Sequence, residues 1–163
     1  MIFVTLGTQD KQFNRLLEWV QKEIDRKKIT EEVHVQAGST KFDSKDMVLY
    51  ELLDVDKFEE LIDKCDILIT HGGVGSILTG LRKNKKIIAV GRKKESGEAE
   101  SDHQQDLIDE FEKDGYILGL NSYEDFDNVL EKIKKFKPRK YVFENEKFIE
   151  KLTNYIDTGN LSI

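Results

Sequence analysis

One stretch, from Asp66 to Asn84, limits the fold of this 163-residue chain more than any other. It begins as a short apolar run of β-branched character (DILIT), turns into the glycine-rich residues 71–76 (HGGVGS), and continues with apolar residues at helical spacing through Leu81. A strand that leads through a glycine turn into the start of a helix presents free backbone N–H groups and a positive dipole end. Glycine permits the positive φ angles and the close ligand approach that this geometry needs. The stretch therefore predicts an anion site, with phosphate as the expected ligand.

Strands and helices alternate along the rest of the chain. The predicted strands are residues 1–6, 33–37, 47–53, 66–70, 86–90 and 116–120. The predicted helices are residues 13–27, residues 55–64, the helix that follows residues 71–76, and residues 102–114, 122–136 and 144–157. Pro138 ends the fifth of these helices. This alternation predicts a Rossmann-like α/β fold, in which a parallel sheet carries helices on both faces.

Each unusual loop follows a predicted strand, so all of them should meet at the carboxyl edge of the sheet, where such sheets bind ligands. These loops are at Gly7, Gly38, residues 71–76 and residues 91–101. Residues 92–101 (RKKESGEAES) have no apolar anchor and predict a mobile surface loop. Its basic start, Arg92-Lys93-Lys94, is either a solvated face or a source of positive charge for a diphosphate.

Composition excludes several classes of function. With 36% charged residues and a net charge of −6, the chain has no overall attraction for nucleic acid or an anionic bilayer. No apolar run approaches the roughly 20 residues of a membrane span, and the single cysteine, Cys65, suits a reducing compartment and a packing role. We expect one domain over residues 1–163, located in the cytoplasm.

Two common phosphate sites do not fit the glycine turn. A P-loop needs lysine after its last glycine, whereas Gly75-Ser76 is followed by Ile77. A dinucleotide fingerprint needs a third glycine where Leu78 stands, and it belongs in the first strand–helix turn of the fold. Kinases, ATPases and NAD enzymes are therefore disfavoured, and with them an unrelated nucleotide-sugar epimerase.

Four motifs, taken in their order and spacing, resemble the C-terminal nucleotide-sugar domain of family 28 glycosyltransferases. They are GTQDKQF at 7–13, QAG at 36–38, THGGVGSIL at 70–78 and DHQQ at 102–105, followed by GYIL at 115–118. The resemblance covers residues 1 to about 158 and implies the C-terminal half of a GT-B fold. Within the family the chain is most similar to the small separate subunits of two-part transferases. One such group makes bacterial capsular and exopolysaccharide, and the other adds the second N-acetylglucosamine to dolichol-linked oligosaccharide.

The resemblance implies a UDP-sugar substrate and assigns residues to parts of it. The implied diphosphate-binding residues are Gly7, Thr8, His71, Gly72, Gly73, Val74, Gly75 and Ser76. The implied donor-sugar residues are Asp102, His103, Gln104 and Gln105. Thr79 stands where family members carry a carboxylate for the ribose hydroxyls, so we expect weaker nucleotide affinity or a substitute acid such as Glu95 or Glu98. Neither a cofactor nor a metal is expected, because the histidines lack metal-ligand spacing.

The implied activity is that of an inverting hexosyltransferase that moves a hexose or N-acetylhexosamine to a polyprenyl-diphosphate-linked saccharide in capsule or exopolysaccharide synthesis. We find no convincing general base, so a membrane-anchored glycosyltransferase partner subunit is expected to supply it and to hold this chain at the inner face of the membrane. The alternative is a non-catalytic subunit that activates another glycosyltransferase. Structural roles are the alternatives to ligand binding for two of these residues: His71 could be a turn residue and Asp102 a helix cap. The predicted helix at residues 144–157 could cover the core or dock a partner.

Overall fold

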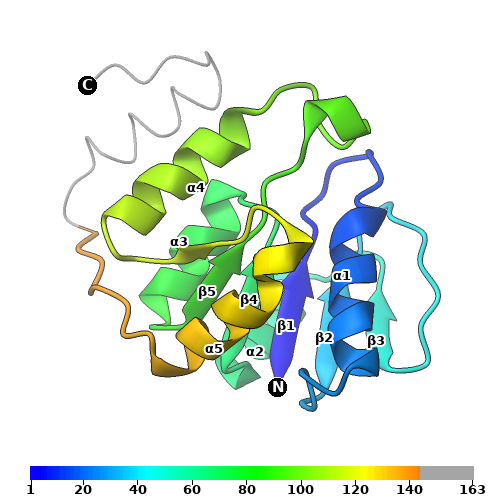
Figure 1. Ribbon diagram of the computed structural model, residues 1–163, viewed down its shortest axis with the longest axis horizontal. Coiled ribbons are helices and arrows are strands. Elements are labelled where there is room, and N and C mark those ends of the chain that lie inside the picture. Colours follow the sequence, from blue (N-terminus) through cyan, green and yellow to red (C-terminus); the bar gives the residue numbers. More distant parts are fainter. Residues whose placement is uncertain (144–163) are drawn as a thin grey trace.

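The computed structural model describes residues 1–143, which form a six-stranded sheet flanked by helices (Figure 1). The strands are β1 (Ile2–Thr5), β2 (Val33–Gln36), β3 (Met47–Tyr50), β4 (Ile67–Thr70), β5 (Lys86–Ala89) and β6 (Leu118–Gly119). They lie in the order β3-β2-β1-β4-β5-β6, and every neighbouring pair is parallel. The predicted parallel α/β sheet is confirmed, and with it the meeting of the strand-end loops at one edge.

Helices cover both faces of this sheet, as predicted. They are α1 (Asn14–Asp25), α2 (Val55–Lys64), α3 (Val74–Arg82), α4 (His103–Lys113) and α5 (Phe126–Lys135), with short 3-10 helices η1 (Lys94–Ser96) and η2 (Tyr123–Asp125). Helices α1 and α5 pack on one face and α2, α3 and α4 on the other (Figure 1). Consecutive β1 residues Phe3 and Val4 point into the two opposite cores, because side chains alternate along a strand.

The centre of the sheet is the point where strand order reverses. β1 pairs with β2 on one side and with β4 on the other, with Thr5 level with both Gln36 and Thr70. The chain leaves β1 toward α1 on one face and leaves β4 toward α3 on the opposite face. The two connections therefore diverge and leave a crevice between the ends of β1 and β4, the usual ligand position in this class of sheet.

Residues 92–101 differ from the prediction of an unanchored surface loop. Arg92, Glu98 and Ala99 are buried, and η1 lies between them. The Arg92 guanidinium donates hydrogen bonds to three carbonyl oxygens, those of Leu6, Lys11 and Glu98. The prediction was wrong because it looked for apolar anchors, whereas charged side chains hold this segment.

Helix ends follow the sequence signals in part. Gly115, at φ +80°, ends α4, and α5 ends before Pro138, the second of these as predicted. Asp102 stands at the N-cap of α4, but its carboxylate accepts from the Lys94 amide rather than from an amide of α4. Ser122 Oγ likewise donates to the Asp125 carboxylate and does not cap a helix amide. The predicted helix at 144–157 lies outside the described residues.

Two further sequence observations concern Cys65 and the membrane. Cys65 is buried beside β4, its thiol donates to the Ile62 carbonyl, and burial raises its pKa to about 11, which confirms a packing role. Across residues 1–143, every helix is too short or too polar to cross a membrane.

Candidate functional site

A cavity of about 540 Å³ opens at the point where the strand order reverses. It is lined by the ends of β1, β2 and β4, by the loop before α2, and by the first turns of α2 and α3. The lining residues are Thr5, Gly7, Thr8, Gln9, Gln36, Leu53, Val55, Phe58, Glu59, His71, Gly73, Gly75, Ser76 and Thr79. Its volume is in the range typical of pockets that enclose a small organic ligand.

The start of α3 supplies hydrogen-bond donors to this cavity. Val74, Gly75 and Ser76 are its first three residues, and the first main-chain bond of the helix runs from Ile77 N to the Gly73 carbonyl. The amides of the first helical turn have no intrahelical acceptor, and the helix dipole adds positive potential there. This end of the cavity is therefore suited to an anion.

Two glycines make room for the imidazole of His71. A Cβ on Gly7, which has φ +77°, would lie 2.5 Å from His71 Nε2, and a Cβ on Gly73 would lie 2.6 Å from the same ring. Neither position tolerates a side chain unless the ring moves. The imidazole is thus enclosed between the turn after β1 and the turn after β4.

Hydrogen bonds around Gln104 fix the proton on His71. The Arg92 amide donates to Gln104 Oε1 at 3.2 Å, so the amide nitrogen of Gln104 faces His71 Nδ1, at 3.4 Å. Because an amide NH₂ only donates, Nδ1 accepts and the ring proton is on Nε2. Burial and the nearby charge of Arg92 lower the pKa of His71 to about 4, which keeps the ring neutral. Nε2–H, between Gly7 and Gly73, is thereby a neutral donor at the cavity wall.

This buried neutral histidine predicts an acid-sensitive fold. Between pH 7 and pH 5 we expect the free energy of unfolding to fall by about 2 kcal/mol more in the wild type than in His71→Asn. The unfolded chain takes up the His71 proton near pH 6.5 and the folded chain only near pH 4, so acid favours unfolding in this window. Urea titrations at both pH values measure the difference. Asparagine keeps an acceptor for Gln104 but does not titrate, so equal slopes for the two proteins would contradict the assignment.

The hydroxyl groups of the turn are engaged inside the protein. Thr70 Oγ1 lies 2.6 Å from Ser76 Oγ, which itself donates to the Gly73 carbonyl at 2.9 Å. Thr79 Oγ1 donates to the Gly75 carbonyl at 2.8 Å. These bonds hold the turn and the first helical turn in shape, so the donors that this turn and α3 offer to a ligand are backbone amides and His71 Nε2–H.

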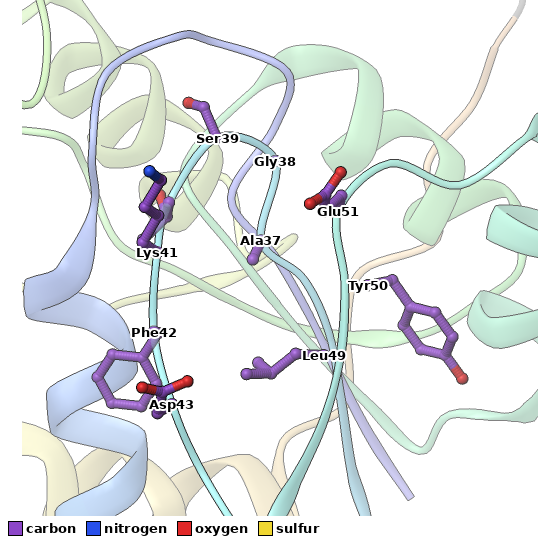
Figure 2. A pocket seen from close by; sticks show the side chains of 10 residues that line it. Ala37, Gly38, Ser39, Lys41, Phe42, Asp43, Leu49, Tyr50 and Glu51 are labelled. Carbon is purple, nitrogen blue, oxygen red and sulfur yellow. The ribbon is translucent and has the colours of Figure 1, made fainter.

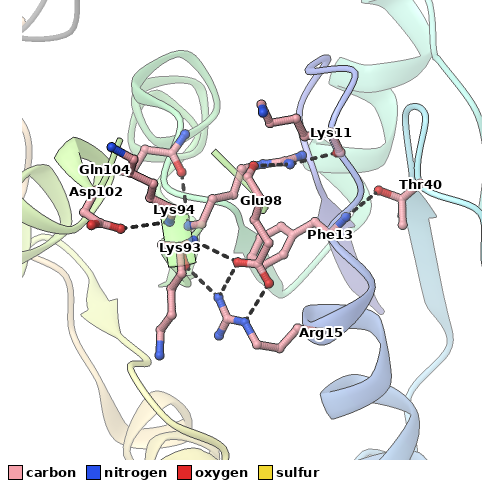
Figure 3. Close-up of polar contacts among 11 residues, drawn as sticks. Lys11, Phe13, Arg15, Thr40, Lys93, Lys94, Glu98, Asp102 and Gln104 are labelled. Carbon is pink, nitrogen blue, oxygen red and sulfur yellow. Dashed lines mark hydrogen bonds and ion pairs between the residues drawn. The ribbon is translucent and has the colours of Figure 1, made fainter. Parts of the chain in front are cut away.

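A buried ion pair holds residues 92–101 beside the site (Figure 3). Arg15 on α1 makes two hydrogen bonds of 2.8 Å to the Glu98 carboxylate, and Glu98 also accepts from the Lys93 amide. The side chain of Glu98 is only 5% exposed. The cluster fixes Arg92, and through its amide the position of Gln104.

Another hollow, of about 800 Å³, lies at the outer edge of the sheet, lined by residues 37–43 and 49–51 (Figure 2). Leu49 and Tyr50 point to opposite sides there, as strand alternation requires. Gly38 separates this hollow from the central cavity, since its amide bonds the Glu51 carbonyl and a Cβ on it would lie 2.8 Å from the Gly7 oxygen.

Comparison with known proteins identifies the family. The model of the glycosyltransferase family 28 C-terminal domain matches residues 1–159. The chain belongs to this family. It is 36% identical over 92 residues to the UDP-N-acetylglucosamine transferase subunit ALG13 of Cryptococcus neoformans var. neoformans serotype D, covering 56% of this chain and 44% of the relative. It is 38% identical over 63 residues to ALG13 of Candida glabrata, covering 38% and 30%. The chain thus spans less than half the length of these curated relatives.

Solved structures confirm the fold of a GT-B C-terminal half. The solution structure of ALG13 matches with a TM-score of 0.60 at 19% identity and covers 93% of both chains. The crystal structure of the kitacinnamycin glycosyltransferase matches with a TM-score of 0.59 at 12% identity, over 81% of this chain and 34% of that one. At these identities the likeness concerns the fold alone.

The residues that the family resemblance assigned to the diphosphate fall into two groups in the structure, those that line the central cavity and those that pack inside the protein. Gly7, Thr8, His71, Gly73, Gly75 and Ser76 line the central cavity, together with Thr79. Gly72, at φ +84°, instead packs against α4, where a Cβ would lie 2.8 Å from Ile108. Val74 packs on the core between the sheet and α2 to α4. These two residues shape the turn, and the amide of Val74 remains at the helix start.

The residues that the family resemblance assigned to the donor sugar also lie in different places. His103 and Gln104 line a smaller cavity of about 360 Å³, which shares Gln9 with the central one. Gln105 instead donates to Asp109 and Asn121. Asp102, bonded to the Lys94 amide, and Gln105 line neither cavity.

Charged residues around the site also differ from expectation. The Arg92 guanidinium is buried and donates its hydrogen bonds to carbonyl oxygens, so it is not available to neutralise a diphosphate. Glu98 is paired with Arg15, and Glu95 on η1 is absent from the cavity lining, so neither of these acids reaches the central cavity, where a substitute for the ribose-binding carboxylate was expected. Within residues 1–143, no three His, Cys, Asp or Glu side chains come close enough to hold a metal ion.

The part of the cavity wall that the end of β2, the loop before α2 and α2 itself form was not predicted from the sequence. Gln36, at the end of β2, donates to Thr5 Oγ1 and accepts from the Leu53 amide, and so joins β1 to the loop before α2. That loop and α2 bring Phe58 and Glu59 to the cavity. The available signals were the position of Gln36 at the carboxyl end of a strand and its place in the QAG motif at 36–38.

Proposed function

We propose that this family 28 chain binds the UDP-sugar donor of an inverting glycosyltransferase, with UDP-N-acetylglucosamine as the first donor to test. The observation that carries the proposal is the cavity at the reversal of strand order, where free amides of α3 and the Nε2–H of His71 converge. The curated relatives are named as UDP-N-acetylglucosamine transferase subunits, which favours this donor.

In the proposed reaction, an acceptor hydroxyl attacks the anomeric carbon of the donor as UDP departs, with inversion of configuration. Negative charge grows on the leaving diphosphate, and donors that are already oriented stabilise it without reorganisation. The amides of Gly75 and Ser76 and the neutral His71 donor supply this stabilisation. His71 Nε2 carries a proton and is therefore an unsuitable base toward the cavity.

A partner subunit completes the proposed enzyme. We assign the general base and the polyprenyl-diphosphate-linked saccharide acceptor to a membrane-anchored partner, which holds this chain peripherally at the cytoplasmic face of the membrane. The name "subunit" that the relatives carry supports such an assembly. Capsule or exopolysaccharide synthesis, expected from the sequence, gains no support from those names, so the proposal stops at a lipid-linked acceptor.

Calorimetric titration with UDP, UMP and UDP-N-acetylglucosamine tests the proposal. We expect UDP to bind at least about tenfold more tightly than UMP, because only UDP places a second phosphate against the helix start. The titration is made with the chain alone and with its membrane partner. Failure of UDP to bind in both preparations, or equal affinity for UDP and UMP, would reject the diphosphate site.

A further inference from the structure

Glu59 is the one acidic side chain among the residues that line the central cavity within the described part of the chain. It belongs to α2, whose Val55, Phe58 and Glu59 face the cavity at helical spacing. Helix α3 contributes Gly75, Ser76 and Thr79 to the same cavity. Both helices start at the carboxyl edge of the sheet and pack on the same face of it, so both border this cavity.

The carboxylate of Glu59 retains most of its capacity to accept hydrogen bonds. Within residues 1–143 its polar contact is with Lys83, whose ammonium lies 3.9 Å from Glu59 Oε2 and only 2.6 Å from Asp63 Oδ1. Lys83 therefore bonds Asp63, one turn further along α2, while it keeps positive charge near Glu59. Glu59 is 54% exposed and open to a ligand.

An acid inside an anion-binding cavity needs a partner other than the anion. A carboxylate repels phosphate, so it must face a part of the ligand that offers hydrogen-bond donors. In a nucleoside diphosphate the two ribose hydroxyls, which lie between the diphosphate and the base, offer two such donors side by side. The cavity lining contains all three kinds of group: amides of α3 for the anion, the Glu59 carboxylate, and the apolar side chains of Leu53, Val55 and Phe58.

We infer that Glu59 binds the ribose diol of the nucleotide, an inference that rests on the proposed function of this site. The family resemblance places a ribose-binding carboxylate at the position of Thr79 on α3, whereas this inference places it on α2. Thr79 lines the same cavity, and its hydroxyl proton is donated to the Gly75 carbonyl. Its oxygen can accept from the ribose hydroxyls, but it is neutral and therefore a weaker acceptor than a carboxylate. The charged acceptor Glu59, on α2, compensates for this weaker acceptor on α3.

Titration of Glu59→Gln with UDP and with 2′,3′-dideoxy-UDP tests the inference. We expect the variant to bind UDP about tenfold more weakly than the wild type, since hydrogen bonds to a charged acceptor are stronger than those to a neutral amide. The affinity for dideoxy-UDP, which lacks both hydroxyls, should change less than about twofold. Glu60→Gln is the matched control, because it makes the same change at the next acid of α2, which lies outside the cavity and pairs with Lys57 and Lys64, so both affinities should stay unchanged.

The outcomes separate this inference from the proposed function. Wild-type affinity of Glu59→Gln for UDP would overturn the role of Glu59 and leave the nucleotide site intact. An equal loss for UDP and dideoxy-UDP would also overturn it, since the carboxylate would then act on something other than the diol. A wild-type chain that binds no UDP, alone or with its partner, would remove the proposed function and this inference together.

Discussion

Gly75→Asp is expected to lower UDP affinity about a hundredfold or more without lowering the stability of the fold. No heavy atom lies within 4 Å of a Cβ built on Gly75, and its φ is not positive, so the side chain enters open space. A carboxylate there lies beside the position offered to phosphate, and two like charges about 4 Å apart repel by several kcal/mol at a protein surface. The same carboxylate in the first turn of α3 interacts favourably with the helix dipole, by about 0.3–1 kcal/mol. Calorimetry with UDP and thermal melts measure the two effects.

The matched control for Gly75→Asp is Gly75→Asn, which has nearly the same shape and no charge. We expect the Asn variant to retain most of the affinity, because it adds bulk in open space without repulsion. If both variants lose binding equally, the effect is steric. If binding and melting temperature fall together in Gly75→Asp, the glycine has a structural role and the anion site is misplaced.

The sheet and its helices were predictable because their signals are local. Apolar runs such as residues 67–70 and 86–89 end at glycine turns, and amphipathic helices separate them. Alternation of the two requires parallel strands, and parallel strands bring their carboxyl ends to one edge. The glycine turn at residues 71–76 could therefore be placed in the site from sequence.

The fixed geometry of residues 92–101 could not be predicted in the same way. Its anchors are polar, and Arg15 and Glu98 are 83 positions apart in the chain. No periodicity of hydrophobic residues reports such a contact. Glu59 was missed for a similar reason: helical spacing shows which face of α2 is buried, but not which cavity the other residues border.

For the two glutamines of the DHQQ motif, too, the sequence does not show which side chain faces the site. Sequence treats Gln104 and Gln105 alike, but successive residues on a helix point about 100° apart. Gln104 therefore reaches His71, while Gln105 turns to Asp109 and Asn121. Once α4 is placed, only one of the two amides faces the site.

Glu98→Ala is expected to lower the free energy of unfolding by about 3–5 kcal/mol, the usual result of removing one partner from a buried ion pair. The change leaves Arg15, whose Nη1 is already buried without a hydrogen-bond partner, with no carboxylate. It also removes the acceptor of the Lys93 amide and loosens the segment that places Arg92 and Gln104. Urea unfolding of the variant and the wild type measures the loss.

Glu100→Ala is the control for Glu98→Ala, since Glu100 lies two residues away in the same segment and also makes an ion pair. Its side chain is 87% exposed and its partner Lys11 lies at the surface, so solvent screens the pair and its removal should leave the urea midpoint nearly unchanged. A second readout separates anchoring from general stability. At a urea concentration where Glu98→Ala is still fully folded, UDP affinity should remain reduced, because Gln104 no longer holds His71 in its donor form. Wild-type stability in Glu98→Ala would mean that this segment is held by Arg92 alone.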